Sequence, residues 1–293
     1  MNKSISIACV SIIIMLAAGA AAFADITPWA DIWTNAGYHS TNGERNNFNS
    51  YLLRSEGKFG VQLNAAGPNM AIEPYLAYYG VISQDPHYWN NNVALGAGVR
   101  MLPFFSYESS SWANEWLKDV KLFVETVNLT ILNDQVSADH DQLKYTDSRW
   151  GLDLWHEWNL NKDIDTGMPW DEMWLNLSYR QTDFMALANN FPGDQFNTYL
   201  LYLQNKFGMH LSGGIRPYLV TYLTTAGVSK SWLNSLYYGV GLRMEPFRDQ
   251  KDPPEILRKF KMFVEVLNIA WLKENEGRPG TDLYFGVDLT FGR

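Results

Sequence analysis

The sequence contains one cysteine, Cys9, among its 293 residues. A single thiol cannot form an intramolecular disulfide, so no disulfide framework is predicted. The chain also lacks a histidine cluster with metal-ligand spacing and a glycine-rich phosphate loop, and we therefore expect no metal and no cofactor. Positive charge is scarce, since 23 Lys and Arg residues stand against 31 Asp and Glu residues for a formal net charge of −8. An acidic chain gives no reason to expect nucleic acid as a partner.

Long apolar runs are absent except at the N-terminus. Lys3 precedes a mostly apolar run over 5–22, which leads into Ala22-Phe23-Ala24. This order is typical of a secretory signal peptide over 1–24, and an uncleaved anchor is the alternative. Because no other stretch has the length of a spanning helix, the mature domain, 25–293, is either a soluble β-protein or a closed membrane barrel.

One unit of the sequence occurs twice. A G-x-G-x-R-x-x-P-F segment is followed by K-x-F-V-E, at 96–104 and 121–125 and again at 239–247 and 261–265. Further blocks match in the same order: 28–38 with 169–179, 48–53 with 196–201, 72–76 with 215–219, and 150–154 with 285–289. We interpret this order as a tandem repeat, with copy one at 28–158 and copy two at 169–293.

The repeated segments alternate in polarity residue by residue, which is the period of a strand with two different faces. Leu53 and Phe59, for example, alternate with Arg54, Glu56 and Lys58. An apolar face beside a charged face is typical of a strand with lipid outside and a polar interior. The aromatic content of 15% also favours the membrane barrel over the soluble protein. The predicted fold is an all-β, transmembrane antiparallel β-barrel of about twelve strands, six in each copy, including strands near 70–82, 120–132 and 148–158.

Two connections at the expected periplasmic end are long. Residues 112–117 and 253–260 are predicted to form short helices there, and plain loops are the alternative.

The last strand carries apolar residues on one face only. Five residues share that face: Leu283, Phe285, Val287, Leu289 and Phe291. The pattern resembles the C-terminal signature by which outer-membrane barrels are recognised for insertion, although Gly292 and Arg293 follow the phenylalanine. The resemblance implies a bacterial outer-membrane location, contact with outer-membrane lipid, and the barrel-assembly machinery as a partner.

Projecting the alternation onto every strand predicts the residues that line the lumen. They are Asp31, Trp33, Arg54, Glu56, Lys58, Arg100, Lys121, Glu125, Asp153, Glu172, Trp174, Lys206, Arg243, Lys261, Glu265 and Asp288. Ion pairs are expected between adjacent strands, from Arg100 to Glu125 and from Arg243 to Glu265. The network either fills a narrow barrel or lines a path for a polar solute, with tryptophan faces for sugar rings.

One loop motif points to a different function. His39-Ser40-Thr41-Asn42-Gly43 resembles the H-x-S-N-G signature of outer-membrane phospholipases and lipid A deacylases, in which a histidine activates a serine at the lipid-facing wall. Thr41 stands where the nucleophilic serine belongs, and a secondary hydroxyl is a more crowded nucleophile. We expect the chain not to be an enzyme, and a lipid hydrolase that uses this loop is the distant alternative.

The repeated G-x-G-x-R-x-x-P-F strand, followed by a strand that reads x-x-F-x-E, resembles the C-terminal barrel domain of bacteriophage adsorption protein A. That family in turn resembles barrels that serve exopolysaccharide secretion. The resemblance implies a pore or exit channel for polar material, linked to polysaccharide export or cell-surface adsorption, with a separate periplasmic export partner. A passive uptake porin for small polar solutes is the alternative.

Overall fold

The computed structural model describes residues 26–42, 49–64, 70–84, 90–105, 112–132, 144–160, 166–182, 196–228, 233–248, 250, 253–272 and 279–292. The predicted signal peptide and Gly43 of the loop motif lie outside these ranges.

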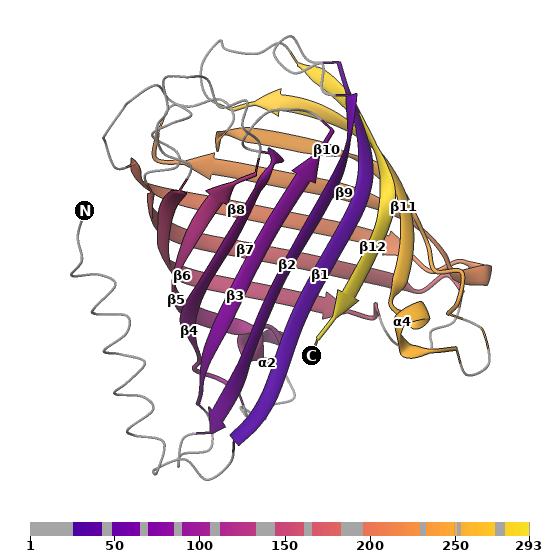
Figure 1. Cartoon of the computed structure of the whole chain (residues 1–293). Helices are drawn as coiled ribbons and strands as arrows, with labels where there is room; N and C mark the ends of the chain where they lie inside the picture. The colour runs from indigo at the N-terminus through magenta and orange to yellow at the C-terminus, as the bar shows by residue number, and fades with distance from the viewer. Residues whose placement is uncertain are drawn as a thin grey trace.

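Twelve antiparallel strands in the described ranges close into one barrel, and each strand pairs with its neighbours in sequence (Figure 1). The strands are β1 (Ile26–Thr41), β2 (Asn49–Asn64), β3 (Ala71–Ser83), β4 (Asn92–Leu102), β5 (Val120–Ile131), β6 (Lys144–Trp158), β7 (Pro169–Thr182), β8 (Phe196–Met209), β9 (Ile215–Ala226), β10 (Ser235–Met244), β11 (Phe260–Trp271) and β12 (Gly280–Phe291). The closing pair joins β1 to β12 over the register from Ile32 opposite Phe291 to Thr41 opposite Asp282. The predicted barrel of twelve strands is confirmed.

Some predicted boundaries are wrong. β6 begins at Lys144, and not near Ser148, because Tyr145 and Asp147 continue the inward alternation and are buried. Asp147 is charged but satisfied there by an ion pair with Arg180, which keeps this polar stretch in the strand.

Short helices occupy both long connections at one end of the barrel, as predicted. α2 (Trp112–Lys118) joins β4 to β5, and α4 (Glu255–Arg258) joins β10 to β11. α4 is shorter than the predicted 253–260, because Phe260 already pairs with Leu289 as the first residue of β11. We call the end that carries α2 and α4 the inner end; β1 begins there and β12 ends there (Figure 1).

A single-turn 3-10 helix, η3 (Ser212–Gly214), joins β8 to β9 at the same end. No helix in the described ranges is long and apolar enough to cross a membrane.

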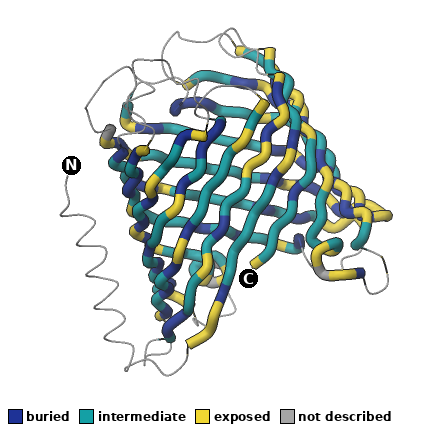
Figure 2. The backbone as a smooth tube through the Cα atoms, in the orientation of Figure 1, coloured by how far each residue is buried: buried dark blue, intermediate teal, exposed yellow. Residues whose placement is uncertain are grey.

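The outside of the barrel is apolar. Buried and exposed positions alternate along the strands (Figure 2), and outward residues such as Leu76, Tyr199 and Leu219 are 66%, 65% and 62% exposed. Large side chains of this kind recur on strands all round the wall, so no water-facing polar side is left. A closed sheet satisfies its backbone without water, and an apolar exterior then suits a lipid bilayer.

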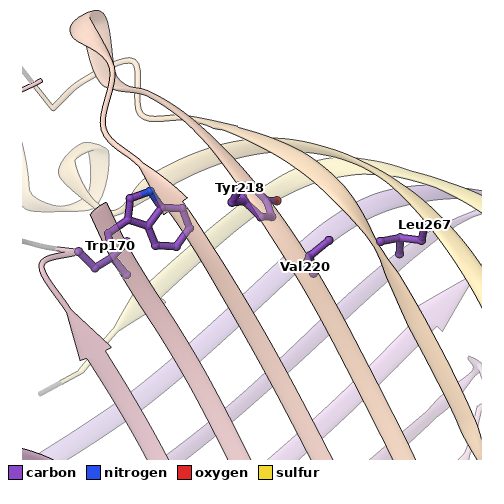
Figure 3. Packing of buried hydrophobic residues seen from close by; sticks show 5 residues of the cluster. Trp170, Tyr218, Val220 and Leu267 are labelled. Atoms are coloured by element: carbon purple, nitrogen blue, oxygen red, sulfur yellow. The ribbon is translucent and has the colours of Figure 1, made fainter. Parts of the chain in front are cut away.

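Aromatic residues pack against the inside of the wall in two equivalent places. Trp29 packs against Tyr75 with ring centroids 6.0 Å apart, and Trp170 packs against Tyr218 at 5.7 Å, both edge to face. Figure 3 shows the second group, in which Val220 on β9 and Leu267 on β11 extend the buried cluster. These clusters fill part of the interior and leave the remainder for polar side chains.

Candidate functional site: the barrel lumen

The barrel encloses a cavity of about 1270 Å³ that is lined by residues from one end of β12, Gly280, to the other, Phe291. β12 has 12 residues. With a rise of about 3.4 Å per residue and a tilt of about 40°, such a strand covers roughly 30 Å of barrel height. A cavity of this volume holds small solutes or a short length of one extended polymer, and it excludes a folded domain.

Fourteen of the sixteen residues predicted to line the lumen lie on the wall of this cavity. They are Asp31, Trp33, Arg54, Glu56, Lys58, Arg100, Lys121, Asp153, Glu172, Trp174, Lys206, Arg243, Lys261 and Asp288. Glu125 and Glu265 also point inward, but other side chains cover them and they are 1% and 0% exposed. Their carboxylates therefore lie beneath the residues that line the cavity, where they bind neighbouring side chains.

Arg100 occupies the centre of the ion-pair network in the first half. Its guanidinium lies over the Trp29 ring at 3.7 Å, pairs with Asp31 at 2.8 Å and forms a second ion pair with Glu73. Glu73 is fully buried and stands directly opposite Arg100 in the β3–β4 register. The arginine therefore fixes three strands, β1, β3 and β4, to one another on the inside of the wall.

Glu125 is held by a different set of groups. The hydroxyls of Tyr75 and Tyr79 donate to its carboxylate at 3.0 and 2.9 Å, and Arg149 pairs with it at 2.7 Å. A buried carboxylate needs such donors because its charge cannot be solvated by water. The cluster connects β3, β5 and β6.

The second half repeats this arrangement with corresponding residues. Arg243 lies 5.0 Å from the Trp170 ring and pairs with Glu172 at 3.0 Å. Tyr218 and Tyr222 donate to Glu265 at 2.7 and 2.8 Å. The equivalence found in the sequence thus extends to side-chain contacts.

The predicted ion pairs from Arg100 to Glu125 and from Arg243 to Glu265 are wrong. Arg100 stands opposite Phe123 in the register, and Glu125 stands opposite Gly98, so the two charges are offset by two residues. Arg100 instead has Glu73 directly across from it on its other neighbouring strand. In the second half that position holds an arginine, Arg216, which pairs with Glu245 at 2.7 Å.

The two halves differ in how they neutralise the buried glutamate. In the first half Arg149 pairs with Glu125, and Lys58 makes no ion pair among the described residues. In the second half the position equivalent to Arg149 is Tyr284, and Lys206 pairs with Glu265 at 3.1 Å. Because Arg149 already pairs with Glu125, the Lys58 ammonium stays at the cavity wall.

Arg149→Tyr should make the first half behave like the second. Without Arg149, Glu125 should attract Lys58, and acetylation of Lys58 by a water-soluble reagent should slow by about fivefold, the factor for about 1 kcal/mol. Site-resolved mass spectrometry measures the rate, with Lys206 as the paired reference within the same sample. An unchanged Lys58 rate in a correctly folded variant would contradict this assignment.

An aromatic group faces the cavity beside these charges. Trp155 and Trp174 stand opposite each other on β6 and β7 with ring centroids 6.3 Å apart, and Tyr202 packs against Trp174 at 4.8 Å. Trp174 donates its indole N–H to Asp153 at 2.7 Å, which fixes the ring orientation. Trp155 and Tyr202 are not among the sixteen predicted lumen residues, although Trp155 is in phase with Asp153 in the alternation of β6.

The residues of the H-x-S-N-G-like loop lie at the barrel closure. His39 Nδ1 is 2.9 Å from Asp282 and Thr41 donates its hydroxyl to the same carboxylate at 3.0 Å. The His39 ring stacks on Tyr284 with centroids 3.8 Å apart. All four residues face the lumen, whereas the resemblance implied a site at the lipid-facing wall.

A histidine at the inner end has a defined protonation state. His210 Nε2 lies 2.9 Å from the carbonyl oxygen of Asn159, so Nε2 carries the proton, and Nδ1 accepts from Arg248 at 3.3 Å. Burial, with the positive charge of Arg248, lowers the pKa of His210. The neutral imidazole is therefore the form that the fold stabilises.

Acid should destabilise this contact. The folded-state pKa of His210 lies below the unfolded value of about 6.5, so its stabilising contribution is present above that pH and is lost as the pH falls further. His210→Gln keeps an N–H donor for Asn159 and cannot titrate. Urea unfolding in detergent at about pH 7.5 and about pH 5 should show a smaller stability loss in the variant than in the wild type, and equal losses would refute the prediction.

Within the described part of the chain, no group of three His, Cys, Asp or Glu side chains could hold a metal ion.

No protein-family model matches the chain, and no curated protein matches it. Solved structures of similar fold are barrels. The β domain of the Bordetella autotransporter BrkA is 12% identical with a TM-score of 0.37, over 91% of this chain and 99% of that chain. The COG4313 outer membrane channel from Pseudomonas putida F1 is 11% identical with a TM-score of 0.37, over 92% and 98%.

The translocator domain of the autotransporter NalP from Neisseria meningitidis is 12% identical with a TM-score of 0.33, over 98% and 97%. Likeness at this level carries no functional argument. The class of the chain follows from its own structure, which is a closed antiparallel barrel with an apolar exterior and a polar lumen, as in outer-membrane barrels.

Proposed function

We propose that the chain is a bacterial outer-membrane β-barrel that forms a pore for polar material. The observation that carries this proposal is a cavity with charged and polar lining residues from one end of β12 to the other. If the inward side chains served only to stabilise the barrel, we would expect them to fill the interior without leaving such a cavity beside the ion pairs. The apolar exterior supports the membrane location.

We further propose polysaccharide as the cargo, with exit from the cell as the direction. Trp33, Trp155 and Trp174 line the cavity, and indole rings offer apolar faces on which sugar rings can stack. The cavity is lined by residues at both ends of β12, which agrees with a chain that passes lengthwise. The alternative is passive uptake of small polar solutes. This alternative is favoured by the fact that one chain by itself forms the cavity.

A separate periplasmic protein is the proposed partner in export. α2 and α4 would present its docking surface, since both lie at the inner end and Ile256 on α4 is 52% exposed. The barrel itself would consist of two fused six-strand halves.

We propose a structural role for His39 and Thr41. Both contact one carboxylate, Asp282, across the β1–β12 closure, and the Thr41 hydroxyl donates a hydrogen bond to that carboxylate. These contacts support a seam that holds the first strand to the last.

Planar-bilayer recording on the purified, refolded protein tests the pore. Steady conductance steps from a protein whose gel migration shifts on heating, as a folded barrel's does, are the expected result. An absence of conductance from the same folded protein would overturn the proposal. Fractionation tests the location separately, because the protein should stay with outer membranes after a carbonate wash.

A further inference from the structure

The two helical connections bring cations to opposite sides of the inner mouth. α2 lies between β4 and β5, and α4 lies between β10 and β11, so six strands separate them in a closed sheet of twelve. The two connections therefore face each other across the barrel. Both lie at the lower end in Figure 1.

The cations occupy equivalent positions in the two connections. Lys118 ends α2 and Lys121 lies at the start of β5; Arg258 ends α4 and Lys261 lies at the start of β11. All four line the cavity, as does Lys259 beside Arg258. Lys118 and Arg258 are exposed, and the other three are half-buried.

None of these five cations makes an ion pair among the described residues. Three acidic groups that line the same end pair with arginines: Asp31 with Arg100, Glu172 with Arg243 and Glu245 with Arg216. The others accept from neutral donors or contact a histidine: Asp119 from His156, Asp153 from Trp174, Glu157 from Trp155 and Asp288 from Asn35. Lys121 and Lys261 stand opposite Asp153 and Asp288 in the strand register, whereas Lys118, Arg258 and Lys259 lie outside the paired strands and present positive charge at the inner mouth.

Aromatic rings share this mouth with the cations. Lys121 stands opposite Asp153 in the β5–β6 register, and Trp155 is the next lumen-facing residue of β6 toward the inner end. Trp174 stands opposite Trp155 on β7. A ligand that enters between α2 and α4 thus meets ammonium and guanidinium groups together with indole faces.

From this combination of cations and indole faces at one end of the lumen we infer that the inner mouth captures anionic saccharides, with Lys118, Lys121, Arg258 and Lys261 binding the acidic groups and Trp155 and Trp174 stacking on the sugar rings. The inference rests on the proposed pore and names its cargo class as a saccharide polymer that carries carboxylates. Cations on opposite sides of a narrow, low-dielectric mouth raise the local concentration of an anionic chain and align it with the lumen. A neutral saccharide would gain only the stacking.

The test uses channel block in planar bilayers by a tetramer of galacturonic acid, with a neutral glucose tetramer as the matched probe. The acidic tetramer should block the wild type at lower concentration than the neutral one, and more strongly from one side. Lys118→Gln/Lys121→Gln/Arg258→Gln/Lys261→Gln should weaken block by the acidic tetramer by about tenfold and leave block by the neutral one unchanged. Lys144→Gln, at an exposed cation that starts β6 at the opposite end of the barrel and is not among the lining residues, should change neither.

A second readout needs no variant. Raising the salt from about 0.1 M to about 1 M shortens the screening length from about 10 Å to about 3 Å, so acidic block of the wild type should weaken steeply. Equal block by the two tetramers, or acidic block that does not depend on salt, would overturn the inference while the pore itself stands. A folded protein with no conductance would refute the pore, which is a different failure.

Discussion

Arg243→Met is expected to destabilise the folded barrel by about 3 kcal/mol, because it leaves the Glu172 carboxylate buried without its ion-pair partner. Glu172 is 3% exposed and Arg243 is 2% exposed, so water cannot replace the lost contact. Urea unfolding in detergent, followed by tryptophan fluorescence and by heat-modified migration, measures the change.

A second substitution separates the charge effect from loss of packing. Arg243→Met/Glu172→Leu removes both charges, and a pair replaced by apolar groups is often neutral. The double variant should therefore regain most of the stability that Arg243→Met loses. Arg258→Met, an exposed cation at the inner end, should stay within about 0.5 kcal/mol of the wild type. Equal stability of Arg243→Met and the wild type would show that the ion pair does not hold β7 to β10.

Gly98→Ala should reduce the yield of folded barrel, at a cost of about 1–3 kcal/mol. The Tyr75 ring lies directly over this glycine, and an added methyl carbon would meet the ring at 2.6 Å and the Val124 carbonyl oxygen at 2.8 Å. Relief would require Tyr75 to move, which would break its hydrogen bond to Glu125. The expected effect is thus on the buried network as well as on packing.

Gly80→Ala is the matched control, because it lies on the neighbouring strand and its new methyl carbon would meet no atom closer than 3.8 Å. It should refold with wild-type yield under the same detergent conditions, as judged by the fraction that migrates as the folded form on unheated gels. Wild-type yield for Gly98→Ala as well would mean that the Tyr75 contact does not constrain β3 against β4.

The barrel could be predicted because its signal is local. A strand with lipid outside and polar groups inside alternates with a period of two, and this period is visible in β2 or β12 without any tertiary knowledge. The inward position of Glu125 and Arg100 followed in the same way. Closure also followed, since an open edge has no place in a bilayer.

The partners inside the lumen could not be predicted from alternation alone. Every inward side chain can reach both neighbouring strands. Arg100 pairs with Glu73 and not with Glu125, because the register places Glu73 directly opposite Arg100. The predicted repeat also misled, because the second half has Arg216 at the position that Glu73 occupies in the first half, and Arg216 pairs with Glu245. Such choices depend on register, which a sequence pattern leaves open.

The inner mouth shows the same limit. Short helices at 112–117 and 253–260 were predictable, but no function for Lys118 or Arg258 was, because alternation does not extend into a helix. The role proposed for these two cations depends on the strand order, which places α2 and α4 on opposite sides of the barrel.

The most direct test of the pore uses cysteine accessibility during single-channel recording. The mature chain is predicted to lack cysteine, so Thr224→Cys introduces a single near-isosteric thiol on the cavity wall. Thr221→Cys on the same strand shares the lipid-facing side with Leu219 and is the matched control. An anionic, water-soluble thiol reagent should lower the conductance of Thr224→Cys in one step and leave Thr221→Cys unchanged. If the conductance of Thr224→Cys does not respond, ions do not pass through this lumen.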